Sequence, residues 1–308
     1  MKLFIVIACG YFVYNKLTKN SQLSFSDFYS NSTKTTLFSL KNIGFLTILS
    51  GFNWFFEIIK WKTLVSFCKK IDFKFAATQS LASLTTSLIT PNRIGEYGAK
   101  AIYFDKKFRK KILVLNLVGN LFQLATTLFF GFIGFTFFLF QFNIDLPVKP
   151  LILISSLLVI TFILSWVLYQ KDFKIKGYSL KSLFNFVRKI QNSIKVKAAI
   201  YSVIRYLIFS HQFYFLLLLF HLEITYTEAM VSIFCMYFLS SIIPMLSIFD
   251  VLIKGSVAIW VFSFFNCNEA SILSVVLIMW LFNFVLPSIA GSYFVLTFNT
   301  DKIFAPKK

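Results

Sequence analysis

Polar side chains recur at helical spacing within the apolar stretches of this 308-residue chain. Three sets have members four or seven residues apart: Asn53, Glu57 and Lys60; Asn116, Asn120 and Gln123; and Arg205 with Gln212. A period of 3.6 residues places each set on one face of a helix. An ionisable side chain in hydrocarbon costs at least about 3 kcal/mol, so we expect these faces to meet partners or water.

A polar break, "LITPNRIGEYGAK", interrupts the apolar sequence at residues 88–100. Thr90 can cap a helix that begins at Pro91, the position where proline is best tolerated, and Asn92 is an alternative cap. Either cap places a helix N-terminus at the break, and Arg93 adds a forked donor that suits phosphate. The stretch therefore predicts a site for an anionic head group, although a surface loop-to-helix junction would carry the same residues.

The break also contains a charge pair that recurs in the second half of the chain. Glu96 and Lys100 are spaced i, i+4, and so are Asp250 and Lys254 in "IPMLSIFDVLIK". Residues at this spacing lie on one helical face, so we expect each break to hold its own ion pair. Two glycines in the first break would permit close approach of another backbone: Gly95 and Gly98.

The elements that must position these residues are membrane helices. The chain is 57% hydrophobic, which a soluble domain of this size could not bury. Six runs approach or exceed the about 20 residues needed to cross a bilayer: 2–18, 43–67, 112–142, 151–169, 197–222 and 270–297. Two shorter runs, 75–90 and 227–243, end at prolines and predict re-entrant helical hairpins.

No spacing of Cys or His indicates a metal site. The net charge of +19 reflects cytoplasmic lysines rather than nucleic-acid binding.

The basic residues divide unequally between the two sides of the predicted six-span topology. One side holds 22 of the 31 Lys and Arg residues and the other holds 6. Cytoplasmic loops carry the excess of Lys and Arg, so both termini are expected in the cytoplasm. An eight-span topology, in which both hairpins cross the membrane, is the alternative.

The two halves of the chain repeat the same order of elements. The two breaks align at an offset of 153 to 154 residues, and the spans pair in the same order: 2–18 with 151–169, 43–67 with 197–222 and 112–142 with 270–297. Three crossings in each half would place the second copy upside down relative to the first. The prediction is one all-α polytopic membrane domain with two inverted repeats, 1–149 and 150–308, each of three transmembrane helices and one re-entrant hairpin. Inverted repeats typify transporters, whose substrate lies between the repeats.

Individual roles follow from these positions. Glu57 can pair with Arg93 or carry a proton, whereas Lys60 and Lys62 are expected to snorkel to the cytoplasmic surface. Trp54 and Trp61 are interpreted as packing residues. The candidate substrate-binding residues are Asn53, Glu57, Arg93, Glu96, Lys100, Asn120, Gln123, Arg205, Asp250 and Lys254.

The motifs "NWFFEIIKW" and "LITPNRIGEYGAKAIYF", with the later proline, acid and lysine, resemble the flippase-like membrane family. That family is typified by the membrane region of lysyl-phosphatidylglycerol synthases. The resemblance covers essentially the whole chain and implies two inverted repeats that move a lipid between leaflets. It also implies that Glu57, Arg93 and Glu96 line the lipid path. The chain departs from the family in the "MLSIF" segment. Only "NTDKIFAPKK" follows the last span, so lysine transfer is not expected.

The sequence thus predicts a non-enzymatic transporter of a phosphate-bearing lipid in a bacterial inner membrane. No Walker motif occurs, and no cofactor is expected. The expected partner is a membrane lipid with an anionic head group, of phospholipid or polyprenyl-phosphate type, and the sequence leaves the oligomeric state open. Two alternatives stay open: an enzyme that acts on a polyprenyl-phosphate lipid, and an accessory subunit of an envelope-assembly complex.

Overall fold

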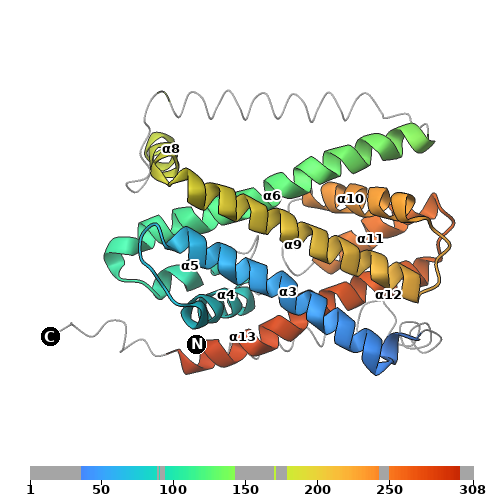
Figure 1. Cartoon of the computed structure of the whole chain (residues 1–308), viewed down its shortest axis with the longest axis horizontal. Coiled ribbons are helices and arrows are strands. Elements are labelled where there is room, and N and C mark those ends of the chain that lie inside the picture. Colours follow the sequence, from blue (N-terminus) through green and yellow to red (C-terminus); the bar gives the residue numbers. More distant parts are fainter. Residues whose placement is uncertain are drawn as a thin grey trace.

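A computed structural model describes residues 36–88, 90, 94–142, 170, 179–242 and 250–298, and the described part is helical (Figure 1). The elements in chain order are η1 (Thr36–Phe38), α3 (Leu40–Val65), α4 (Phe73–Leu88), α5 (Ile94–Ile102), α6 (Lys106–Phe142), α8 (Leu180–Lys189), α9 (Asn192–Leu219), α10 (Tyr226–Ile242), α11 (Asp250–Ser263), α12 (Glu269–Trp280), η3 (Leu281–Val285) and α13 (Leu286–Thr297). The element η3 is a π-helical turn that joins α12 to α13 without a break.

Within the described residues, four helical segments are long and apolar enough to cross a membrane: α3, α6, α9 and the continuous α12–η3–α13 segment. They confirm the predicted apolar runs 43–67, 112–142, 197–222 and 270–297 as long helices. The other two predicted spans, 2–18 and 151–169, lie outside the described residues. Helix α6 begins at Lys106, six residues before the predicted run, because the basic residues "KKFRKK" are good helix formers and extend it.

Two pairs of shorter helices lie where the sequence predicts hairpins. Helix α4 packs on α5, and α10 packs on α11. These four helices contain 16, 9, 17 and 14 residues, each fewer than the about 20 needed to span a bilayer. The two pairs lie toward opposite ends of the long helices (Figure 1).

Local hydrogen bonds fix where the short helices begin. The Asp72 carboxylate accepts the Phe75 N–H at 3.2 Å before α4. Thr225 and Glu228 form a reciprocal capping pair at the start of α10, because the Thr225 N–H donates to the carboxylate and the Glu228 N–H donates to the hydroxyl. Thr90 accepts the Gly95 N–H at 2.8 Å, as a capping residue does. The structure describes helix α5 from Ile94, and the expected start at residue 91 lies outside the described residues.

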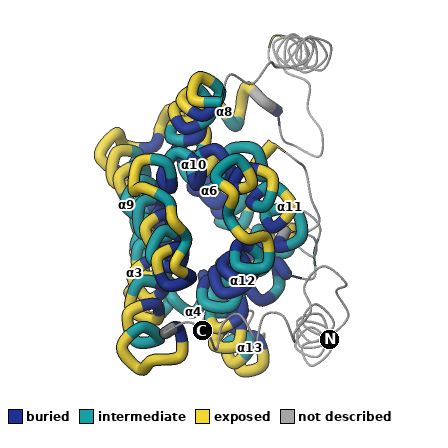
Figure 2. The backbone as a smooth tube through the Cα atoms, turned by 90° about the vertical axis from the view of Figure 1, so that its right-hand side faces the viewer, coloured by how far each residue is buried: buried dark blue, intermediate teal, exposed yellow. Residues whose placement is uncertain are grey.

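Helix packing in the first half has a counterpart in the second. Helix α3 packs on α4 and α9 packs on α10, while α5 packs on α6 and α11 packs on α12. Between the halves, α6 packs on α10 and α13 packs on α4. Seen along their axes, these helices lie around a common centre (Figure 2).

Glycines allow the closest of these contacts between the halves. A Cβ at Gly291 on α13 would overlap the carbonyl oxygen of Leu81 on α4. A Cβ at Gly134 on α6 would lie 2.6 Å from Phe234 Cβ on α10. Neither position has room for a side chain, so the hairpin helices α4 and α10 pack directly on the backbones of α13 and α6.

Helix α8 lies across the bundle at the end where α6 and α9 begin (Figure 1). Ser179 and Ser182 form its N-terminal capping box. Phe186 contacts Phe67 with ring centroids 5.5 Å apart, which attaches α8 to the loop after α3. We call this end of the bundle the basic end, because most of the described cations belong to its loops and helix ends: Lys62, Lys69, Lys70, Lys74, Lys106, Lys107, Arg109, Lys110, Lys111, Lys181, Arg188, Lys189, Lys195 and Lys197.

Candidate functional site

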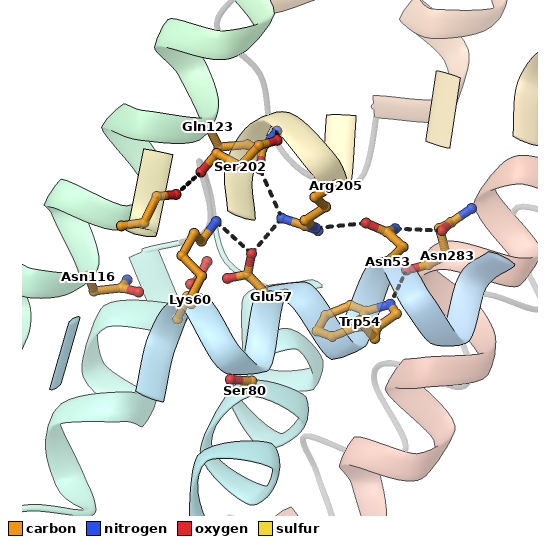
Figure 3. Close-up of polar contacts among 12 residues, drawn as sticks. Asn53, Trp54, Glu57, Lys60, Ser80, Asn116, Gln123, Ser202, Arg205 and Asn283 are labelled. Atoms are coloured by element: carbon orange, nitrogen blue, oxygen red, sulfur yellow. Dashed lines mark hydrogen bonds and ion pairs between the residues drawn. The ribbon is translucent and has the colours of Figure 1, made fainter. Parts of the chain in front are cut away.

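Arg205 on α9 is the centre of a polar network in the interior of the bundle (Figure 3). Its Nη1 donates to Glu57 Oε2 on α3 at 2.6 Å, and its Nε donates to Asn53 Oδ1 at 2.8 Å. Gln123 Oε1 on α6 lies 3.5 Å from the same Nη1, at the limit of a hydrogen bond. Three long helices therefore meet at one guanidinium. The sequence predicts that their polar faces point inward, but not that they meet at Arg205.

Lys60 belongs to this network, contrary to the expectation that it snorkels. Its Nζ lies 2.7 Å from Glu57 Oε2, and the residue is only 2% exposed. The helix that contains it continues to Val65, so Lys60 lies more than a turn inside the end of α3. Glu57 thus contacts two cations, and its described partners are Lys60 and Arg205. The predicted partner Arg93 lies outside the described residues.

A chain of amide side chains orients the guanidinium. Arginine can only donate, so Asn53 must present its oxygen to Arg205, and its Nδ2 then donates to Asn283 Oδ1 at 2.7 Å. Asn283 Nδ2 donates in turn to Gln212 Oε1 at 2.9 Å, and Gln212 Nε2 donates to the Leu46 carbonyl at 3.2 Å. Each amide has one orientation that satisfies both neighbours. We call this series the amide relay.

The amide relay passes through the π-helical turn η3. A π-turn displaces the helical hydrogen-bond ladder by one residue and is frequent at functional sites. Here two of its carbonyls accept side chains of α3: Phe282 accepts the Ser50 hydroxyl, and Asn283 accepts the Trp54 indole N–H at 3.0 Å. The turn is thereby attached to α3 on the same face that holds the network. The sequence analysis did not select Asn283, although it is the lone amide of the most apolar candidate span.

The predicted ion pair of the first break forms as expected. Lys100 Nζ lies 2.7 Å from Glu96 Oε1, donates to Asn116 Oδ1 at 2.8 Å, and is 4.4 Å from the centroid of the Trp61 ring. All three contacts are buried, with Lys100 2% exposed. Trp61 is itself buried and donates to Gln79 Oε1 at 2.7 Å. The pair is therefore part of the interior.

The two glycines of the first break differ in their surroundings. A Cβ at Gly95 would lie 2.5 Å from the Thr86 carbonyl oxygen, which confirms the close approach that the sequence predicts. At Gly98 an added Cβ would meet no atom within 4 Å, so the same expectation is wrong there. Gly95 holds α5 against α4, while Gly98 makes no such contact.

Two adjoining cavities flank Arg205. One has a volume of about 460 Å³ and is lined from the α4–α5 side by Ser80, Ser83, Glu96, Tyr97 and Lys100. The other has a volume of about 320 Å³ and is lined from the α10–α11 side by Met236, Tyr237, Ser240, Ser241, Val251 and Lys254. We call them the first-hairpin cavity and the second-hairpin cavity. Their walls share Trp54, Leu84, Gln123, Thr127 and Arg205.

The remaining predicted residues have different outcomes. Asn120 lines the first-hairpin cavity and donates to the Tyr97 hydroxyl at 3.1 Å. Lys254 lines the second-hairpin cavity, with its Nζ 5.5 Å from the Phe284 ring centroid. Helix α11 includes Asp250, but its side chain lies outside the described part, so the expected pair with Lys254 stays a prediction.

The site therefore combines buried cations, oriented amides and aromatic walls at the junction of two cavities. Such an arrangement can hold an anionic group, because the guanidinium is fixed in place before a ligand arrives. No protein-family model, curated protein or solved structure matches this chain.

Proposed function

We propose that this chain is a multi-pass protein of a bacterial inner membrane that moves a phosphate-bearing lipid between leaflets, in the manner of the flippase-like family that its motifs resemble. The proposal includes two inverted repeats, 1–149 and 150–308, with α4–α5 and α10–α11 as re-entrant hairpins. The matching packing of helices in the two halves supports the repeat. The placement of the two short-helix pairs toward opposite ends of the bundle supports its inversion.

The proposed orientation places the basic end and both termini in the cytoplasm. The described cations concentrate at that end, where the described acids are Asp72 and Asp105. The opposite end carries Lys41 with three acids: Glu223, Glu228 and Glu269. This distribution follows the excess of Lys and Arg that marks cytoplasmic loops.

One observation carries the proposal of transport: Arg205 lies on the walls of both cavities. A group bound at its guanidinium would be next to the first hairpin on one side and the second hairpin on the other. If the hairpins enter from opposite leaflets, a head group can exchange between cavities without leaving the arginine. The buried position of the network favours this role over surface catalysis, in which the reacting groups would face the aqueous phase.

The test is reconstitution of the purified protein into liposomes that contain a fluorescent phospholipid. A membrane-impermeant quencher measures the fraction of lipid that reaches the outer leaflet. We expect transport by the wild type, strong loss in Arg205→Gln, and partial loss in Arg205→Lys, which keeps the charge but not the forked donor. Arg188→Gln on the exposed face of α8 is the matched control and should transport as the wild type does.

Two results would contradict the proposal. The first is wild-type liposomes that move no lipid faster than protein-free liposomes, which would favour the accessory-subunit alternative. The second is transport by Arg205→Gln equal to that of the wild type, which would place the lipid path elsewhere.

A further inference from the structure

The network around Arg205 contains one more positive than negative charge. Glu57 Oε2 is shared by Lys60 Nζ at 2.7 Å and Arg205 Nη1 at 2.6 Å. Within the described ranges, neither cation contacts a second carboxylate. One carboxylate therefore serves two cations at a buried position.

The neighbouring charges do not correct this imbalance. Lys100 is matched by its own carboxylate, Glu96, at 2.7 Å, so that pair is neutral. The amide relay contributes oriented dipoles but no formal charge. Among side chains in direct contact, the asymmetry is thus confined to Glu57, Lys60 and Arg205, which we call the charge triad. Lys254 lies elsewhere on the wall of the second-hairpin cavity.

The excess charge of the triad is accessible only through Arg205. Lys60 is fully enclosed, with 3% of its side chain exposed, whereas 18% of the Arg205 side chain is exposed. Its Nε and Nη1 are occupied, and among the described residues Nη2 makes no hydrogen bond. Arg205 borders both cavities, so a ligand in either one could reach this amino group.

We propose that the charge triad selects a head group with one net negative charge at its phosphate, that is, a phosphodiester, over both a dianionic phosphomonoester and a phosphate-free neutral head group. The inference rests on the proposed function, because it concerns the same site. In a poorly solvated interior an uncompensated charge of either sign is unfavourable. A neutral head group leaves the triad with one positive charge in excess, a phosphodiester balances it, and a dianion leaves one negative charge in excess.

The experiment compares three fluorescent lipids with identical acyl chains in the same liposome assay. They are phosphatidylglycerol with one charge, phosphatidic acid with two, and diglucosyl diacylglycerol with none. The assay is run at about pH 8.5, well above the second phosphate pKa of about 6, so that the phosphomonoester is dianionic. The readout is the ratio of rates for two lipids in one protein sample, after subtraction of protein-free rates, because a ratio does not depend on how much protein is folded.

Two substitutions move the charge of the triad in opposite directions. Glu57→Gln leaves two positive charges and should raise the rate for the dianion relative to the monoanion. Lys60→Gln leaves the site with no excess positive charge, so the ratio of the rates for the monoanion and the neutral lipid should fall. A nearby charge shifts a protonation equilibrium by about one to three pKa units, so each ratio should change by roughly tenfold or more. Glu223→Gln, an acid outside the network, should leave both ratios unchanged.

The proposal is overturned if the wild type moves the monoanion and the dianion at equal rates, or if Glu57→Gln and Lys60→Gln leave both ratios unchanged. In those cases lipid is still moved, and the proposed function stands without this charge selection. If the wild type moves none of the three lipids, the proposed function itself fails together with the inference.

Discussion

Glu57 and Arg205 lie 148 residues apart in the sequence, yet their side chains meet at 2.6 Å in the interior of the bundle. The contact joins α3 of the first half to α9 of the second. Lys60 binds the same carboxylate oxygen, so the pair is one arm of a three-residue arrangement. The charge triad therefore links the two halves of the molecule at the border of the two cavities.

The shared carboxylate predicts that removing Glu57 lowers the stability of the protein more than removing Arg205, one of its two partners. Glu57→Gln leaves Lys60 and Arg205 as neighbouring buried cations, which should cost about 3–5 kcal/mol of stability. Arg205→Met leaves Glu57 with Lys60 as a neutral pair and removes the donor to Asn53 Oδ1, so it should cost less, about 1–3 kcal/mol. Thermal unfolding of the two variants in the same detergent measures the difference. An Arg205→Met protein that is less stable than Glu57→Gln would show that the carboxylate does not serve both cations.

The amide relay predicts that Asn283 is sensitive to a change of one atom. Asn283→Asp replaces the donor that faces Gln212 Oε1 and the Met279 carbonyl by an acceptor. Each buried polar group left without a partner costs about 1–3 kcal/mol. Asn283→Asp should therefore be less stable than the wild type by a few kcal/mol, while Asn192→Asp at the exposed start of α9 should change little. Similar unfolding temperatures for the two variants would mean that the relay does not hold Asn283.

The close contact of α13 with α4 predicts a large effect of a single methyl group. Gly291→Ala would place its Cβ against the Leu81 carbonyl and the Thr85 hydroxyl, so the helices must separate. Such overpacking typically costs about 1–3 kcal/mol. Gly44→Ala on α3 is the control, because its Cβ would meet nothing within 4 Å and alanine favours a helix by about 1 kcal/mol. A stable Gly291→Ala protein would contradict the contact between α13 and α4.

Two native cysteines report the orientation of the bundle. Cys68 lies just after α3 at the basic end, and Cys267 lies just before α12 at the opposite end. In variants that retain one cysteine each, an impermeant maleimide should label Cys267 from outside intact cells and Cys68 only after the cells are opened. Labelling of both from the same side would contradict the proposed topology.

The rate of this labelling should depend on pH in a defined direction. Burial raises the pKa of both thiols, and for Cys68 the nearby Lys111 partly opposes the shift. At neutral pH each thiolate fraction is then smaller than for a free cysteine, because the pKa lies further above the pH. The pH at which labelling reaches half of its maximal rate should therefore lie above the usual thiol pKa of about 8.5. A midpoint at the free-thiol pKa would show that neither thiol is shielded.

The sequence predicts local features of this fold better than long-range ones. Apolar length locates the four described long helices, and i, i+4 spacing predicts the pair of Glu96 with Lys100, because both depend on neighbours along one helix. Periodicity also indicates that Arg205 faces inward. It does not say which carboxylate Arg205 meets, since helices far apart in sequence are brought together only by packing.

The errors at the site have the same origin. Lys60 was expected at the surface because lysine near a helix end snorkels, but its Nζ lies beside Glu57 three residues earlier in the chain. Asn283 has no polar neighbour at helical spacing, so no pattern marks it. Its partners, Asn53 and Gln212, come from α3 and α9 and are brought to it by packing.

The central claim is that the network around Arg205 binds the phosphate of a lipid. The most direct measurement is native mass spectrometry of the protein purified in mild detergent, with the bound lipids released and identified. The account predicts that the wild type and Arg188→Gln retain a phosphate-bearing lipid, and that Arg205→Gln, folded to the same extent, loses it. Retention of the same lipid at the same occupancy by Arg205→Gln would contradict the claim.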